Sequence, residues 1–232
     1  MQDGDGKFSG KASGIRAVIL DYGEVLCRRA PLEKFAPMAQ ILRITPERLL
    51  ERYAQNRLDY DRGDVSASDY WTGFGRETGA PISPAQVEEL DRLDCSIWWD
   101  LDPHIVDWVR RLRANGIKAG VISNMFIGLA KQIRESAPWL HDFDDYTFSA
   151  ELRLTKPDPL IYRHSLRQLG IDPAQALFLD DRQTNIEGAR AIGMEGLLYS
   201  TPQQLHEDLA SWQFPILPLA ANNPISHEIK TS

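Results

Sequence analysis

The sequence predicts an α/β protein: a Rossmann-like, doubly wound parallel sheet with an α-helical cap inserted into it. Three observations support this class. An apolar run of strand length, residues 15–20, ends abruptly in Asp21. Only helical patterns follow over residues 31–95. Beyond residue 97, strand and helix patterns alternate, which is typical of a parallel sheet with helices on both faces.

The first strand pattern opens the core, and the helical insertion divides the core in two. We expect a flexible leader over residues 1–14, a catalytic core over 15–27 and 97–215, a helical cap over 28–96 and a C-terminal tail over 216–232. Four cap helices are predicted, with starts near Glu33, Pro46, Ser68 and Ser83, and the charged segment Asp59 to Val65 is read as a connection between helices. A helical unit beside a reactive strand end is well placed to act as a lid.

The second half of the chain supplies the rest of the core. Asp102-Pro103 marks the start of a helix that ends near Ala114, and Gly170 ends another helix. Strand patterns occur at 117–122, 146–149, 176–179 and 196–199, and further helical patterns at 126–135, 159–169, 184–191 and from 202 onward.

Composition restricts the partners. The chain has 232 residues, of which 43% are hydrophobic, so it can bury a sizeable core. A formal net charge of -7 argues against a nucleic-acid or anionic-membrane surface. Cys27 and Cys95 have no metal-ligand spacing, and no run approaches the roughly 18 apolar residues that span a bilayer. We expect a cytoplasmic monomer or homodimer that binds neither nucleic acid nor membrane.

Polar residues follow three of the strand patterns. These are Asp21, the pair Ser123-Asn124, and the pair Asp180-Asp181. The carboxyl ends of parallel strands lie at one edge of a sheet, so these residues can share one pocket, with Lys156 before Pro157 as a fourth element. Taken singly, each could be a strand-end cap or a solvated lysine. Adjacent carboxylates at the end of a buried strand are costly without a cation, so this alternative is weakest for the aspartate pair.

In this order, the motifs resemble those of the haloacid dehalogenase-like hydrolases. They are Ile19-Leu20-Asp21 with Gly23, Val121-Ile122-Ser123-Asn124, Lys156-Pro157-Asp158-Pro159, and Leu179-Asp180-Asp181 followed by Asn185. The resemblance covers about residues 16–202 and is greatest to helical-capped phosphatases with an Asp-x-Gly first motif. Each motif alone is weak, but four in order with a helical insertion after the first are specific.

The resemblance implies a Mg²⁺-dependent hydrolase, a phosphatase of a small phosphorylated metabolite, with sugar phosphates among the candidates. Asp21 would be the nucleophile and form an aspartyl-phosphate. Mg²⁺ would be held by Asp21, Asp181 and the backbone carbonyl of Gly23, with Asp180 and Asn185 orienting the metal or its waters. The transferring phosphoryl group would be bound by Ser123, Asn124 and Lys156, and Lys156 would also neutralise charge.

One position departs from the family pattern. The commonest pattern places a second Asp, the acid that protonates the leaving group, where this chain has Gly23. Glu24 is one residue further and cannot be assumed to replace it. A positioned general acid contributes about 10² to 10⁴ in rate, so we expect a slower enzyme that favours leaving groups needing little protonation, or one that borrows an acid from the cap or from water.

Two other functions stay open, and the sequence does not decide which cap residues contact the substrate. A metal-independent 2-haloacid dehalogenase would use the same nucleophile, although Asp180-Asp181 argues against it. A non-catalytic domain that binds a ligand or a protein is opposed by the retained Asp21, Lys156 and Asp181. The aromatic and arginine residues of the cap could contact substrate, or could form the cap's core and solvated face: Arg28, Arg29, Arg52, Tyr53, Arg57, Tyr60 and Trp71.

Overall fold

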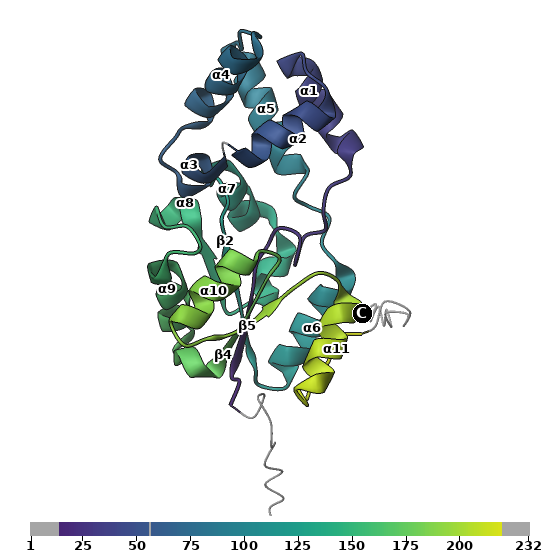
Figure 1. Ribbon diagram of the computed structural model, residues 1–232, viewed down its shortest axis with the longest axis vertical. Helices are drawn as coiled ribbons and strands as arrows, with labels where there is room; N and C mark the ends of the chain where they lie inside the picture. The colour runs from purple at the N-terminus through teal and green to yellow at the C-terminus, as the bar shows by residue number, and fades with distance from the viewer. Residues whose placement is uncertain (1–13, 56, 220–232) are drawn as a thin grey trace, which may run out of the picture.

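The computed structural model describes residues 14–55 and 57–219, which form an α/β core with a helical cap above it (Figure 1). The core contains a five-stranded parallel sheet with the order β3-β2-β1-β4-β5. Its strands are β1 (Ala17–Leu20), β2 (Lys118–Ser123), β3 (Asp145–Phe148), β4 (Ala176–Asp180) and β5 (Glu195–Leu198). The predicted fold class is confirmed.

Register brings the polar strand ends together. Leu20 at the end of β1 pairs with Val121 of β2 on one side and with Leu179 of β4 on the other. The next residues along all three strands therefore reach the same edge of the sheet. Central β1 consists entirely of buried apolar residues, as expected of a strand covered on both faces.

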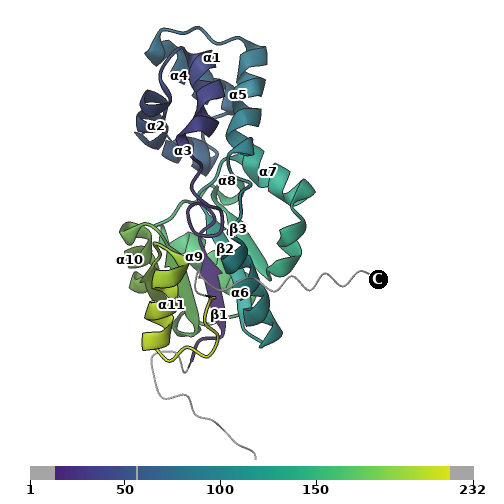
Figure 2. The same cartoon turned by 90° about the vertical axis from the view of Figure 1, so that its right-hand side faces the viewer.

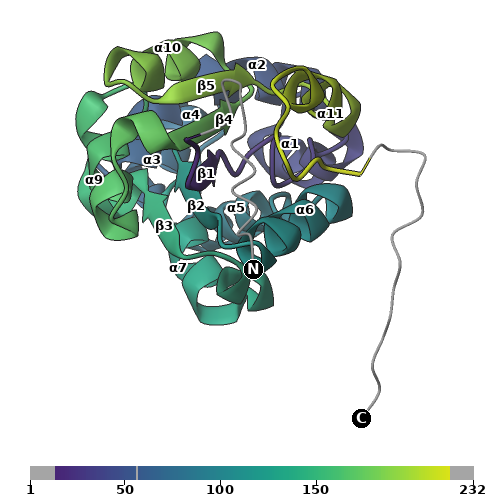
Figure 3. The same cartoon turned by 90° about the horizontal axis from the view of Figure 1, so that it is seen from below.

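Helices cover both faces of the sheet, as Figure 3 shows from below. On one face, Ala17 and Ile19 pack with residues of α9 (Pro159–Leu169) and α10 (Gln183–Ala191). On the other face, Val18 and Leu20 share a core with residues of α6 (Pro103–Ala114), α7 (Ile127–Ser136) and α11 (Pro202–Ser211). This alternation follows from the two-residue period of a strand.

Short polar side chains define several core helices, as predicted. The carboxylates of Asp102 and Asp158 accept hydrogen bonds from the backbone N–H groups of His104 and Leu160, and Thr201 caps α11 in the same manner. Gly170 ends α9 with a positive φ of 63°, the left-handed conformation that glycine adopts without strain. The core also contains α8 (Ser149–Leu152) and the 3₁₀ segments η2 (Pro138–Asp142) and η3 (Pro173–Gln175).

Within the described residues, the cap contains five α-helices, one more than predicted. Besides the 3₁₀ segment η1 (Leu32–Phe35), they are α1 (Ala36–Leu42), α2 (Pro46–Gln55), α3 (Arg57–Arg62), α4 (Ala67–Thr78) and α5 (Pro84–Ser96). Ser83 forms the expected capping box with Gln86. Helix α4 is capped by Ser66, two residues before the predicted start.

The extra helix is α3, so the reading of Asp59 to Val65 as a connection was wrong for its first half. Arg57 and Asp61 lie one turn apart and form an ion pair, with Nε and Oδ1 2.7 Å apart. The same guanidinium binds Asp94 of α5, with Nη1 and Oδ2 2.7 Å apart. Contacts with α5 thus stabilise a short helix whose own sequence favours a loop.

The cap rests on the core at the carboxyl edge of the sheet (Figure 2). Helix α3 packs against α8, and α5 packs against α7. The Ser149 hydroxyl at the start of α8 donates a hydrogen bond to the Asp61 carbonyl of α3. The two segments that connect core and cap are also hydrogen-bonded to each other: the Arg28 N–H donates to the Asp100 carbonyl, and the Asp102 N–H donates to the Leu26 carbonyl. The cap therefore covers the strand ends.

The two chain ends lie largely outside the described residues, so the predicted leader and most of the predicted tail are not described. The described start of the tail contacts the core. Trp108 Nε1 donates to the Ile216 carbonyl at 2.7 Å, and Arg111 Nη1 donates to the Leu217 carbonyl at 2.8 Å. Among the described helices, we find none with the length and apolar character that crossing a membrane requires.

Candidate active site

A cavity of about 570 Å³ lies between the carboxyl edge of the sheet and the cap. Its floor is formed by residues that follow β1, β2 and β4, and its wall by cap residues and the segment after β2. The lining residues are Asp21, Tyr22, Gly23, Glu24, Tyr53, Arg57, Leu58, Asp61, Trp98, Ser123, Asn124, Met125, Leu129, Lys156, Asp181, Arg182 and Asn185.

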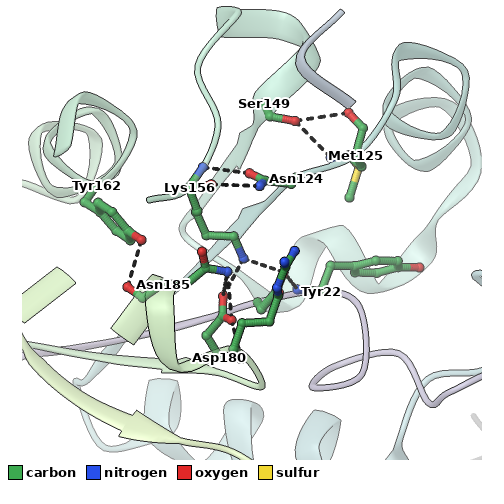
Figure 4. Close-up of polar contacts among 10 residues, drawn as sticks. Tyr22, Asn124, Met125, Ser149, Lys156, Tyr162, Asp180 and Asn185 are labelled. Atoms are coloured by element: carbon green, nitrogen blue, oxygen red, sulfur yellow. Dashed lines mark hydrogen bonds and ion pairs between the residues drawn. The ribbon is translucent and has the colours of Figure 1, made fainter. Parts of the chain in front are cut away.

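Lys156 is the centre of the floor (Figure 4). Its Nζ lies 2.7 Å from Asp21 Oδ1 and 2.7 Å from Asp180 Oδ2, and all three side chains are buried. Burial alone would lower the pKa of Lys156, but the two carboxylates outweigh it and raise that pKa above its usual value. The structure therefore joins two residues that are 159 positions apart in sequence, Asp21 and Asp180, through one ammonium group.

Three carboxyl groups meet beside this lysine. Ligand oxygens of Asp21, Asp180 and Asp181 lie within 4.8 Å of one another. Burial is the main cause that raises the pKa of Asp21 to about 8 and that of Asp181 to about 6, and the neighbouring carboxylates add to it. Three ionised carboxylates and one ammonium would leave a net charge of −2. A divalent cation with oxygen ligands matches that charge and that donor set.

Hydrogen bonds fix Asp180 more fully than its two neighbours. Its Oδ1 accepts from the Arg182 backbone N–H at 2.9 Å and from Asn185 Nδ2 at 2.9 Å, while Oδ2 accepts from Lys156. Asn185 is held in turn, because its carbonyl accepts from the Tyr162 hydroxyl at 2.8 Å. Asp180 is thus held from below the floor by Asn185 and other groups, whereas Asp21, Asp181 and Asn185 line the cavity.

Ser123, the last residue of β2, and Asn124, which follows it, have different surroundings. Ser123 is buried and lines the cavity, and its hydroxyl makes no hydrogen bond to the part of the chain described here. The Asn124 amide is engaged at both ends by the Lys156 backbone: Nδ2 donates to the carbonyl at 3.1 Å, and Oδ1 accepts from the N–H at 2.8 Å (Figure 4). The Asn124 side chain thus positions the Lys156 backbone; Asn124 also lines the cavity, and its expected contact with the phosphoryl group stays a prediction.

Of the cap residues that the sequence offered as substrate contacts, Tyr53 and Arg57 line the cavity. Tyr60 and Trp71 are buried in the cap's aromatic core. Three arginines have acidic partners away from the floor: Arg28 with Asp102, Arg29 with Glu24, and Arg52 with Glu77.

Seven lining residues were not predicted from the sequence: Tyr22, Leu58, Asp61, Trp98, Met125, Leu129 and Arg182. Leu58 and Asp61 belong to α3, the helix that the sequence pattern did not reveal. Trp98 and Arg182 do carry a local signal, because each lies close to a boundary that was recognised: Trp98 follows the cap, and Arg182 follows Asp180-Asp181.

Trp98 explains the glycine in the first motif. A Cβ placed on Gly23 would lie 3.2 Å from Trp98 Cζ3, which is closer than ordinary van der Waals contact. The ring is held in place, since its Nε1 donates to the Tyr53 hydroxyl at 3.3 Å. The indole therefore occupies space that a side chain at position 23 would need.

We expect Gly23→Ala to reduce the free energy of unfolding by about 1–3 kcal/mol through overpacking against Trp98. For the same steric reason, we expect Gly23→Asp to give no gain in activity. Gly73 is the matched control, because it lies within α4 and a Cβ there meets nothing within 4 Å. Gly73→Ala should instead stabilise the protein by about 0.5–1 kcal/mol. Urea unfolding measures the change in free energy of unfolding for the two alanine variants. Equal changes in Gly23→Ala and Gly73→Ala would contradict the steric account.

The chain is similar in sequence to a known family and to proteins named phosphatases. A family model of haloacid dehalogenase-like hydrolases matches residues 15–193. A sesquiterpene phosphatase of Aspergillus oryzae is 28% identical over 138 residues, covering 60% of this chain and 69% of its own length. A phosphatase of Mycobacterium tuberculosis is 30% identical over 141 residues, covering 60% of this chain and 64% of its own length.

The fold also matches a solved structure. A haloacid dehalogenase family enzyme from Bacteroides thetaiotaomicron, crystallised with magnesium and inorganic phosphate, superposes with a TM-score of 0.63 at 22% identity. The match covers 81% of this chain and 95% of that chain. At this level of identity the similarity establishes a shared fold.

Proposed function

Because the chain belongs to the haloacid dehalogenase-like hydrolase family, we propose that it is a Mg²⁺-dependent phosphatase of a small phosphorylated compound, with Asp21 as the nucleophile. The observation that carries the proposal is the buried Lys156, whose Nζ contacts both Asp21 and Asp180 beside Asp181. A capping role for Asp21 accounts neither for a buried lysine at this place nor for three converging carboxyl groups.

The floor residues suit a bound Mg²⁺. Asp21 and Asp181 would be the direct ligands, because the oxygens of Asp180 are already engaged by Lys156, Asn185 and the Arg182 backbone. When bound, Mg²⁺ would supply the positive charge that allows a phosphate dianion to approach these carboxylates. The relatives named phosphatases, and the fold shared with an enzyme crystallised with magnesium and phosphate, support this assignment.

The two oxygens of Asp21 have different surroundings. Oδ1 accepts from the Tyr22 backbone N–H at 2.6 Å and contacts Lys156 Nζ. Oδ2 has no hydrogen-bond partner among the described residues and is the oxygen proposed to attack phosphorus. A bond forms between Oδ2 and phosphorus while the ester oxygen leaves, and water then hydrolyses the aspartyl-phosphate. The Ser123 hydroxyl would donate to a phosphoryl oxygen, and Lys156 would offset the developing negative charge.

Phosphate release from 4-nitrophenyl phosphate tests the proposal. A chelator should abolish release and added Mg²⁺ should restore it. The Mg²⁺ concentration for half-maximal rate should fall as pH rises from about 6 to about 8, because protons on Asp181 and Asp21, whose pKa values are raised to about 6 and about 8, compete with the metal.

Two outcomes would contradict the proposal. Release of phosphate that continues in chelator would remove the role of the metal. Metal-independent release of chloride from 2-chloropropionate, with no phosphate release, would assign the alternative dehalogenase activity.

A further inference from the structure

We infer that the substrate is the monophosphate ester of a hydrophobic alcohol, rather than a sugar phosphate or a compound with a second anionic group. This inference rests on the proposed function and names its substrate class. It is carried by the wall of the cavity, which lies above the phosphate-binding floor and is where the rest of the ester would have to fit.

Five apolar or aromatic side chains belong to the wall. Tyr53 and Leu58 come from the cap, Trp98 from the crossing back to the core, and Met125 and Leu129 from the segment after β2. Leu58 is 52% exposed, one of the few large apolar side chains so exposed in the described structure. An exposed leucine is unremarkable alone, but here it lines a cavity together with four other apolar or aromatic side chains, and such groups are typical of small-molecule sites.

The polar groups of Tyr53, Trp98 and Asp61 on the wall are already engaged. The Tyr53 hydroxyl donates to Asp94 Oδ1, and Trp98 Nε1 donates to the Tyr53 hydroxyl. The Asp61 carboxylate accepts from Arg57 Nε at 2.7 Å. A sugar would have to give up its hydrogen bonds to water in this part of the cavity without gaining equivalent ones from these three groups, which is unfavourable.

The charges of the lining also oppose a second anion. The Arg57 side chain is only 12% exposed, is paired with both Asp61 and Asp94, and stacks 4.2 Å above the Tyr53 ring. The remaining cation of the wall, Arg182, is exposed and is attracted to Asp61. The exposed carboxylate of Glu24 lies on the same rim. Among its described residues, the cap thus provides no buried free cation for a bisphosphate or a sugar acid.

Trp98 also lies next to Gly23, the position at which the family pattern has its acid. The chain has no side chain at position 23 to protonate a leaving alkoxide, and an indole ring fills the space instead. The indole therefore offers a flat, apolar face next to Gly23, in the cavity that Asp21 also lines, where it can contact the ester.

Benzyl phosphate and 2-hydroxyethyl phosphate form a matched pair of substrates, because their leaving alcohols have similar acidity. We expect kcat/KM with Mg²⁺ to favour the benzyl ester about 10-fold or more. Calorimetry with the non-hydrolysable benzylphosphonate and 2-hydroxyethylphosphonate, also with Mg²⁺, should show the same order in Kd without requiring turnover.

Leu58→Asn should reduce the benzyl preference several-fold. Leu160→Asn is the matched control, since Leu160 is 53% exposed on α9 and does not line the cavity; it should leave the preference unchanged. Equal or reversed preference in wild type, an unchanged preference in Leu58→Asn, or binding of neither phosphonate would overturn the inference. Preferential binding of benzylphosphonate without hydrolysis of either ester would support the inference and overturn the proposed phosphatase activity instead.

Discussion

Replacing Asp21 by asparagine is expected to lower kcat for a phosphate monoester by about 10⁴-fold or more. The amide keeps the shape of the carboxyl group but is a poor nucleophile, so the aspartyl-phosphate cannot form. The Tyr22 N–H and Lys156 Nζ both contact Oδ1, and the oxygen of an asparagine side chain can occupy that place. Steady-state phosphate release measures the loss. A decrease of less than about tenfold would exclude Asp21 as the nucleophile.

Stability separates this catalytic loss from misfolding. Burial raises the pKa of Asp21, so in the metal-free protein its ionisation opposes folding and stability falls as pH rises from about 4 to about 8. The Asp21→Asn variant should lack this decline and be at least as stable as wild type at pH 8. Asp145→Asn is a matched control, because Asp145 is buried and accepts from Ser165 at 2.6 Å, away from the cavity. Its activity should stay within a few-fold of wild type.

Lys156→Met is expected to reduce the free energy of unfolding of the metal-free protein by about 3–5 kcal/mol. The ammonium is the buried counter-charge that contacts Asp21 and Asp180, and its removal leaves converging carboxylates unpaired. Urea unfolding at pH 8 measures the loss. Lower pH or added Mg²⁺ should recover part of it, because protonation and metal binding each relieve the same repulsion.

Lys118→Met tests whether the loss is specific to the site. Lys118 also uses its Nζ, which donates to the Leu169 carbonyl at 2.6 Å, but it lies at the exposed start of β2 and has no carboxylate partner within the described residues. Its loss should be about 0.5–1.5 kcal/mol, the contribution of one hydrogen bond. Equal losses in the two lysine variants would contradict the view that Lys156 compensates buried charge.

Several members of the floor could be predicted from local patterns. Asp21, Ser123 and the aspartate pair each follow an apolar run of strand length, and a parallel sheet necessarily brings such ends to one edge. Lys156 was singled out by its place in a motif beside Pro157. Such residues can be recognised because strand period and strand termination are properties of consecutive residues.

The direction of a side chain was harder to predict than its presence. Asn124 lines the cavity as expected, but the sequence did not reveal that its amide is bound to the Lys156 backbone, 32 positions away. Helix α3 was missed because its stability depends on the contact of Arg57 with Asp94, 37 positions away. Neither contact leaves a periodic signal in the sequence.

The sequence by itself therefore determined the α/β class, the inserted cap, the family and the set of polar residues at the strand ends, since all of these follow from patterns of neighbouring residues. Only the tertiary structure decided that Asn124 supports Lys156, that Trp98 fills the space beside Gly23, and that Arg57 is neutralised by Asp61 and Asp94. The physical reason is that these features depend on packing and charge compensation between distant segments, which set the chemistry of the cavity wall.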